Sequence, residues 1–123
     1  MAVLSLFDFS GVWSNPFRKA GHTVYQVDAK LGTNIESGTP DWIDSHPVDV
    51  ILAAPPCTDF AQCGSQWWTR KDAEGSTERS VALIRQTLAI IAQAKPKIWA
   101  LENPVGRLNR LVPELAPFGP WYF

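Results

Sequence analysis

The chain has 123 residues, 46% of them apolar and 19% charged, which suits one folded domain with a single core. This composition excludes a disordered, collagen-like or coiled-coil protein. The net charge of −1 argues mildly against a tight binder of duplex nucleic acid, although Arg107 and Arg110 with Arg70 and Lys71 could form a local basic patch.

A strand and a short helix are predicted at the start of the chain. The apolar run 2–7 ends at Asp8 and is typical of a buried strand followed by a tight loop. Residues 15–20 favour a helix, with Asn15 as its N-cap, a proline in its first turn and Gly21 just past its end.

Two further strands are predicted in the next segment. Residues 22–28 are rich in β-forming side chains and end on Asp28, whereas 40–46 favour a single helical turn. The run 48–54 is almost entirely apolar, which predicts a central strand covered on both faces. A long polar loop, 55–75, follows this strand.

The second half of the chain contains a long helix and a fourth strand. From residue 76 to 94, apolar side chains recur at steps of three and four, which predicts an amphipathic helix that ends before Pro96. Residues 97–102 are predicted to form a strand and residues 104–123 a loop. Alternating strands and helices predict one α/β domain over residues 1–123, with a mainly parallel sheet and helices on both faces.

Polar or reactive residues follow all four predicted strands. The carboxyl ends of parallel strands share one edge of the sheet, and ligands of α/β proteins bind there. We therefore predict a binding or active site at this carboxyl edge. Its members are the loop from Asp8 to Ser14, Asp28, the run Pro55-Pro56-Cys57 and the run Glu102-Asn103-Pro104.

The first two of these positions suit a small ligand. The loop after the first strand has one glycine, Gly11, where a dinucleotide fingerprint requires three, so NAD and P-loop functions are rejected. Gly11 still lets the backbone approach a ligand closely, although an ordinary turn would have the same residues. Asp28 can accept hydrogen bonds from a ribose diol, but an acid at a strand end is common.

Cys57 is the strongest candidate for chemistry. The two prolines before it fix φ and remove backbone donors, so the chain leaves the strand rigidly and aims the next side chain, as a nucleophile requires. The alternative is that Cys57 is a small buried apolar residue, the usual fate of a free cysteine. Cys63 is assigned to that role or to an ordinary loop position.

Glu102 is the second candidate for chemistry. It follows the apolar segment 98–101, which predicts partial burial of its carboxyl group and therefore favours the protonated form. A neutral carboxyl group near a thiol can act as a general acid. A solvated acid at the end of a strand is the alternative explanation.

Location and metal content are predicted from features that the sequence lacks. Residues 1–9 have no charged start of a secretory signal, and no apolar run approaches the ~20 residues needed to span a bilayer. We therefore expect a cytoplasmic protein with free thiols and no membrane partner. His22 and His46 are not spaced with the cysteines as a zinc-ligand set, so no metal is expected.

The four clusters, in this order, resemble those of the carbon-5 cytosine DNA methyltransferases, in particular the short phage-type members. The proline-proline-cysteine element combined with an acid-asparagine strand end is specific as a pair, whereas the first loop is less so. The resembling segments cover nearly the whole chain: LFDFSGVWSNPFRKAG (6–21), VDAKLG (27–32), DVILAAPPCTDFA (49–61) and ALENPVGRL (100–108).

The resemblance implies a Rossmann-like fold that binds S-adenosylmethionine and methylates carbon 5 of cytosine in DNA. Cys57 would be the nucleophile and Glu102 the acid that contacts the target base, which is either flipped from the duplex or single-stranded. The other residues assigned to cofactor binding are Phe7, Asp8, Ser10, Gly11, Trp13, Asp28, Asn34, Ile35 and Pro55. Those assigned to the substrate or DNA are Pro56, Asn103, Trp67, Trp68, Arg70, Lys71 and Arg107.

The loop with Trp67 and Trp68 is expected to act as a lid. The two tryptophans could stack on nucleotides while Arg70 and Lys71 meet phosphates. Packing of the tryptophans on the base of their own loop is an equally good explanation.

Two departures from the family pattern leave functions other than an active methyltransferase open. Phe9 stands where much of the family has glycine, so it could crowd the cofactor. The chain ends before the family's further strands and any separate target-recognition region, which suggests a truncated member, either a fragment or a minimal variant. Its sheet would have an open edge, which predicts homodimerisation or poor solubility. A non-catalytic remnant that binds S-adenosylmethionine or nucleic acid is the alternative to an enzyme, and an α/β domain of other chemistry is a third.

Overall fold

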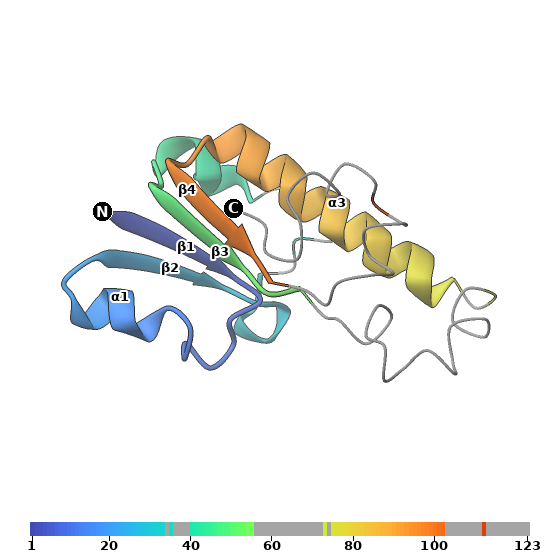
Figure 1. Cartoon of the computed structure of the whole chain (residues 1–123), viewed down its shortest axis with the longest axis horizontal. Helices are drawn as coiled ribbons and strands as arrows, with labels where there is room; N and C mark the ends of the chain where they lie inside the picture. The colour runs from blue at the N-terminus through green and yellow to red at the C-terminus, as the bar shows by residue number, and fades with distance from the viewer. Residues whose placement is uncertain (34, 36–39, 56–72, 74, 103–111, 113–123) are drawn as a thin grey trace.

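A four-stranded parallel sheet is the centre of the computed structural model, which describes residues 1–33, 35, 40–55, 73, 75–102 and 112. The strand order is β2-β1-β3-β4 (Figure 1). The strands are β1 (Ala2–Leu6), β2 (Thr23–Val27), β3 (Val50–Ala53) and β4 (Ile98–Leu101). The elements of the described residues also include the helices α1 (Asn15–Lys19) and α3 (Ser76–Ala94) and the 3₁₀ turns η1 (Ala29–Leu31) and η3 (Asp41–Ser45).

The two faces of the sheet are covered by different helices. Side chains alternate along a strand, so Val3 lies in one apolar cluster with residues of α1, whereas Leu4 lies in another with residues of α3. All four residues of β3 are buried, which confirms the prediction of a central strand covered on both faces. The predicted α/β fold with a parallel sheet is confirmed as well.

The larger core lies between the sheet and α3. Ile84 and Ile90 of α3 are almost completely buried and pack with Ile51 of β3, as the apolar stripe of the helix predicts. The predicted bounds of this helix, 76 and 94, are confirmed. It ends because Lys95 adopts a left-handed conformation, with φ of 49°, directly before Pro96.

The predicted N-cap of α1 was wrong by one residue. Ser14, rather than Asn15, is the capping residue, and its carbonyl oxygen accepts the N–H groups of Phe17 and Arg18. Serine and asparagine are about equally favoured as N-caps, so the sequence alone does not decide whether Ser14 or Asn15 begins the helix.

The turn η3 packs against β2 and α3. Its Trp42 ring packs against Tyr25 with a centroid distance of 5.5 Å, and Ile43 is buried in the core with α3. Gln93 of α3 donates a hydrogen bond of 2.8 Å to Asp44. The helical turn expected at 40–46 is therefore present in 3₁₀ form.

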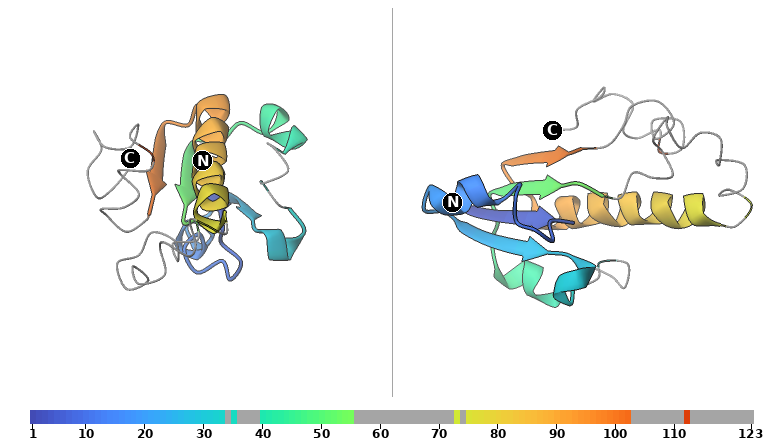
Figure 2. Two further views of the ribbon diagram at one scale, coloured as in Figure 1. Left: turned by 90° about the vertical axis from the view of Figure 1, so that its right-hand side faces the viewer. Right: turned by 90° about the horizontal axis from the view of Figure 1, so that it is seen from below.

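The long helix α3 extends beyond the sheet. It runs opposite to the strands, and its first turns project past their carboxyl ends (Figures 1 and 2). No helix in the described part of the chain is long and apolar enough to cross a membrane.

Thr77, in the first turn of α3, carries a buried hydroxyl group that has no hydrogen-bond partner among the residues that the structure describes. An unsatisfied buried hydroxyl is destabilising, so Thr77→Val should raise the free energy of unfolding by about 1 kcal/mol in urea denaturation. The matched control is Thr87→Val, because the buried Thr87 hydroxyl donates to the Leu83 carbonyl at 2.9 Å. The control should be destabilised or unchanged, and an equal loss in both variants would contradict the prediction.

Candidate functional site

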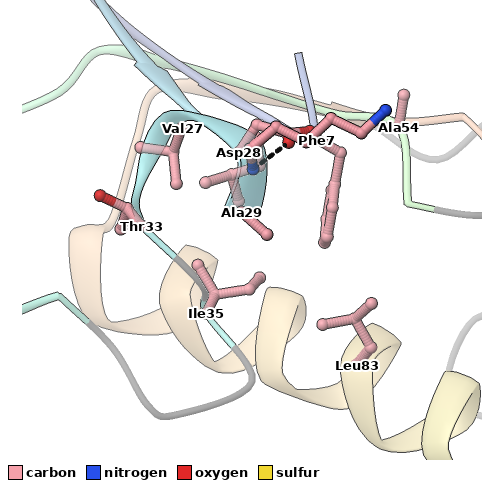
Figure 3. A pocket seen from close by; sticks show the side chains of 10 residues that line it. Phe7, Val27, Asp28, Ala29, Thr33, Ile35, Ala54 and Leu83 are labelled. Carbon is pink, nitrogen blue, oxygen red and sulfur yellow. Dashed lines mark hydrogen bonds between the residues drawn. The ribbon is translucent and has the colours of Figure 1, made fainter. Parts of the chain in front are cut away.

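A cavity of about 400 Å³ lies at the carboxyl edge of the sheet, on the side covered by α3 (Figure 3). Its volume falls in the range of about 300–1,000 Å³ that is typical of small-molecule sites. The described residues that line it come from the ends of β1, β2 and β3, the segment after β2, and α3. They are Leu6, Phe7, Val27, Asp28, Ala29, Lys30, Thr33, Ile35, Ala54 and Leu83.

Phe7 lines the cavity because the backbone turns sharply at the end of β1. Its φ of 63° is a left-handed conformation that is rare and strained for a bulky residue. In a continued strand, Phe7 would point to the face opposite Leu6. The turn allows both side chains to line the same cavity, and the Phe7 N–H donates to the Val27 carbonyl at 2.7 Å.

Asp28 lies at the end of β2 with its carboxylate at the cavity wall. One carboxylate oxygen accepts the N–H of Lys30 at 2.8 Å, which fixes the orientation of the group. The second oxygen accepts no hydrogen bond from any residue that the structure describes. A half-buried carboxylate with one such oxygen can accept a hydroxyl group of a ligand.

The rest of the described wall is mainly apolar. Val27 and Ile35 are buried, and Leu83 faces them from α3 across the cavity (Figure 3). Of the residues predicted to bind a cofactor, Phe7, Asp28 and Ile35 are brought together here.

Asp8 lies away from the cavity and organises the first loop instead. The side chain is 6% exposed, and its Oδ2 accepts the Ser5 hydroxyl at 2.9 Å and the Ser14 N–H at 3.1 Å. Burial acts to raise the pKa of this carboxyl group. Hydrogen bonds from both serines and from the backbone N–H of Gly11 outweigh burial, so the pKa of Asp8 lies below its ordinary value.

The other predicted residues of the first loop also lie outside the described cavity wall. Ser10 is exposed, and its hydroxyl accepts the Val12 N–H at 3.4 Å. Trp13 packs on the α1 side of the sheet. Gly11 has a φ of 76°, and a Cβ atom there would lie only 3.1 Å from the Gln26 amide oxygen, so both conformation and space favour glycine.

Phe9 is not among the described residues that line the cavity. The residue is 52% exposed and lies outside that lining, so crowding of a bound cofactor by Phe9 stays a prediction.

Glu102 follows β4 at the same edge of the sheet. Its N–H donates to the Ala53 carbonyl at 2.9 Å, but its side chain is exposed, so the expected partial burial was wrong. Alternation along β4 places Glu102 on the face of Ile98, which is 60% exposed on this outermost strand. Pro55 is buried directly after Ala54, which lines the cavity.

Several predicted residues lie outside the part of the chain that the structure describes. They are Asn34, Pro56, Cys57, Trp67, Trp68, Arg70, Lys71, Asn103 and Arg107.

Sequence reasoning missed several cavity residues, including Lys30, Thr33 and Leu83. Leu83 belongs to the apolar stripe of α3, and its position near the start of a helix that runs back along the sheet could have pointed to the carboxyl edge. Lys30 and Thr33 carry no such signal, because polar residues after a strand are ordinary loop residues.

The family model for the C-5 cytosine-specific DNA methylases matches residues 2–110 of the chain. The match covers the sheet and the helices α1 and α3 of the described residues.

Two curated proteins are similar to the chain. The Type II methyltransferase M.Bsp6I of Bacillus sp. (strain RFL6) is 33% identical over 96 residues, which cover 77% of this chain and 29% of that protein. The probable DNA (cytosine-5)-methyltransferase of Frog virus 3 (isolate Goorha) is 30% identical over 128 residues, which cover 93% of this chain and 59% of that protein. The chain thus spans less than two thirds of either relative. By the family match and these similarities, it belongs to the C-5 cytosine-specific DNA methylase family.

Proposed function

We propose that this chain binds S-adenosylmethionine in the cavity and takes part in methylating carbon 5 of cytosine in DNA. The observation that carries the proposal is the cavity itself. It lies at the carboxyl edge of the parallel sheet, with the Asp28 carboxylate in its wall, in a chain of the C-5 cytosine-specific DNA methylase family.

The residues present fit this cofactor. Val27 and Ile35 offer an apolar surface to the adenine ring, and Asp28 offers a carboxylate oxygen to the ribose diol. The Phe7 ring is held as a rigid part of the same wall by the backbone turn at the end of β1. When bound, S-adenosylmethionine supplies the methyl group.

The chemistry is assigned to Cys57 and Glu102. Carbon 5 of cytosine is a poor nucleophile, so the Cys57 thiolate first adds to carbon 6 of the ring while Glu102 supplies a proton to ring nitrogen N3, which receives the electron pair displaced through carbons 5 and 4. The electron pair of the thiolate becomes the new S–C bond, and the ring becomes enamine-like, with a nucleophilic carbon 5. After carbon 5 has gained the methyl group, a base removes its proton and the thiolate of Cys57 leaves.

The DNA must present the target base outside the stack. Flipping a base costs a few kcal/mol, and single-stranded DNA avoids this cost. Trp67 and Trp68 are proposed to stack on nucleotides, and Arg70, Lys71 and Arg107 to meet phosphates.

The first test is thermal unfolding with and without S-adenosylmethionine. A ligand at 100 times its Kd stabilises the folded state by about 2.7 kcal/mol, which raises the Tm of a domain of this size by several degrees. Transfer of a labelled methyl group to DNA, with 5-methylcytosine identified in the digested product, tests the reaction. Absence of any stabilisation by millimolar S-adenosylmethionine would contradict the cofactor assignment.

Asp28→Asn should weaken S-adenosylmethionine binding about 10-fold or more, because a charged acceptor of the ribose hydroxyls is lost while the shape of the side chain is kept. Isothermal titration calorimetry measures the change. Asp41→Asn, at an exposed aspartate of η3, is the matched control and should keep the wild-type Kd. If Asp28→Asn also keeps the wild-type Kd, the ligand does not contact this carboxylate.

A further inference from the structure

Lys30 has no role in the chemistry above, although it lines the cavity. Among the described lining residues it carries the positive charge and Asp28 the negative charge. The two side chains come from the same turn, because the Lys30 N–H donates to the Asp28 carboxylate at 2.8 Å. The cavity therefore offers a ligand one acidic and one basic contact from one short segment.

The ammonium group of Lys30 is held by an aromatic ring of the neighbouring loop. Its Nζ lies 5.2 Å from the centroid of the Phe9 ring, a distance at which a cation is attracted to the face of the ring. Phe9 is exposed, so this contact rather than burial in the core places the ring beside the lysine.

Phe9 is itself fixed to the sheet. The Gln26 amide in β2 donates to the Phe9 carbonyl at 2.9 Å, which ties the backbone of this loop to the sheet. The Lys30 ammonium therefore lies between the loop after β1 and the turn after β2. Each of these segments contributes a residue to the cavity wall, Phe7 from the first and Asp28 from the second.

We propose that Lys30 is a specificity-determining residue of the cavity, which pairs with the carboxylate of the methionine part of S-adenosylmethionine, and that Phe9 is its positioning residue. The proposal rests on the proposed function. Asp28 and the apolar wall suit a nucleoside, but they cannot distinguish the full cofactor from one without the carboxylate. A positively charged group at the cavity makes this distinction, because it gains a charge-assisted hydrogen bond only from the full cofactor.

The test compares two ligands, S-adenosylmethionine and its decarboxylated analogue, which keeps the adenosine, sulfonium and amine. Calorimetric Kd values are measured for the wild type, Lys30→Met, Lys30→Arg and Phe9→Leu. Lys30→Met should weaken S-adenosylmethionine binding about 10-fold and leave the decarboxylated analogue within about twofold. Lys30→Arg keeps the charge and should retain most of the affinity. Phe9→Leu should weaken S-adenosylmethionine binding by a smaller factor, about 2- to 3-fold, without affecting the analogue.

Lys19→Met, at an exposed lysine of α1, is the matched control and should change neither Kd. Equal weakening of both ligands by Lys30→Met, or no weakening of either, would overturn the assignment of Lys30 while leaving the cofactor in place. Weaker binding of DNA with an unchanged Kd for S-adenosylmethionine would also overturn it and place Lys30 against phosphate. If the wild type binds neither ligand, the cofactor assignment itself fails and the role of Lys30 fails with it.

Discussion

Replacing Cys57 with alanine should reduce methyl transfer to DNA about a thousandfold or more, while the Kd for S-adenosylmethionine stays within about twofold. The size of the loss follows from the chemistry, because removal of a covalent nucleophile abolishes the step that activates carbon 5. The cofactor is proposed to bind in the cavity formed by Phe7, Asp28 and Ile35, which the substitution does not change. Labelled methyl transfer under single-turnover conditions measures the rate, and calorimetry measures the affinity.

Cys63→Ala is the matched control, because it removes the other cysteine of the chain and should retain transfer. If Cys57→Ala still methylates at the wild-type rate, the cysteine-adduct mechanism is wrong. If the wild type binds S-adenosylmethionine but transfers no methyl group to any DNA, the chain is the non-catalytic remnant that the sequence leaves open.

Asp8→Asn should lower the free energy of unfolding by about 2–3 kcal/mol at neutral pH. The buried carboxylate accepts hydrogen bonds from Ser5 and Ser14, and hydrogen bonds to a charged group contribute more than those to a neutral amide. Urea denaturation measures the loss, with Asp41→Asn as the exposed control that should remain within about 0.5 kcal/mol of the wild type.

The same substitution should have a characteristic pH dependence. The folded-state pKa of Asp8 lies below its ordinary value of 3.8, so its carboxylate stabilises the folded state above that value. This contribution is lost as the pH falls through the lower folded-state pKa. The difference in unfolding free energy between the wild type and Asp8→Asn should therefore be constant near neutral pH and shrink below about pH 4. A difference that does not change down to pH 2 would show that packing, rather than charge, is responsible.

The sheet and the long helix could be predicted because their apolar patterns leave no alternative. In a run such as 48–54, the side chains after Asp49 are apolar on both faces of the strand. Such a strand is expected inside a sheet that is covered from both sides. The stripe of α3 has a single helical face, and Pro96 ends it. The start of α1 was less determined, because Ser14 and Asn15 are both good N-caps.

The candidate site could be placed at the correct edge but not resolved into individual roles. Asp8 and Asp28 each follow a strand, and no pattern in the sequence distinguishes them. In the structure, Asp28 faces the cavity, whereas Asp8 is buried in a network with Ser5 and Ser14. The left-handed turn at Phe7 comes directly before Asp8 and has no counterpart before Asp28. No pattern in the sequence predicts that a bulky residue adopts this conformation.

The strand order has a consequence for how the chain folds during synthesis. β1 lies between β2 and β3, so the pair β1-β2 can form as soon as the first 27 residues are available. Among the described strands, β4 pairs with β3 alone, and the long connection from Ala53 to Ile98 must be made before the two can pair. Closing this connection costs chain entropy that grows with its length. Until then, the apolar surface of β3 that α3 and β4 cover remains exposed, and exposed apolar surface of this kind favours aggregation of folding intermediates.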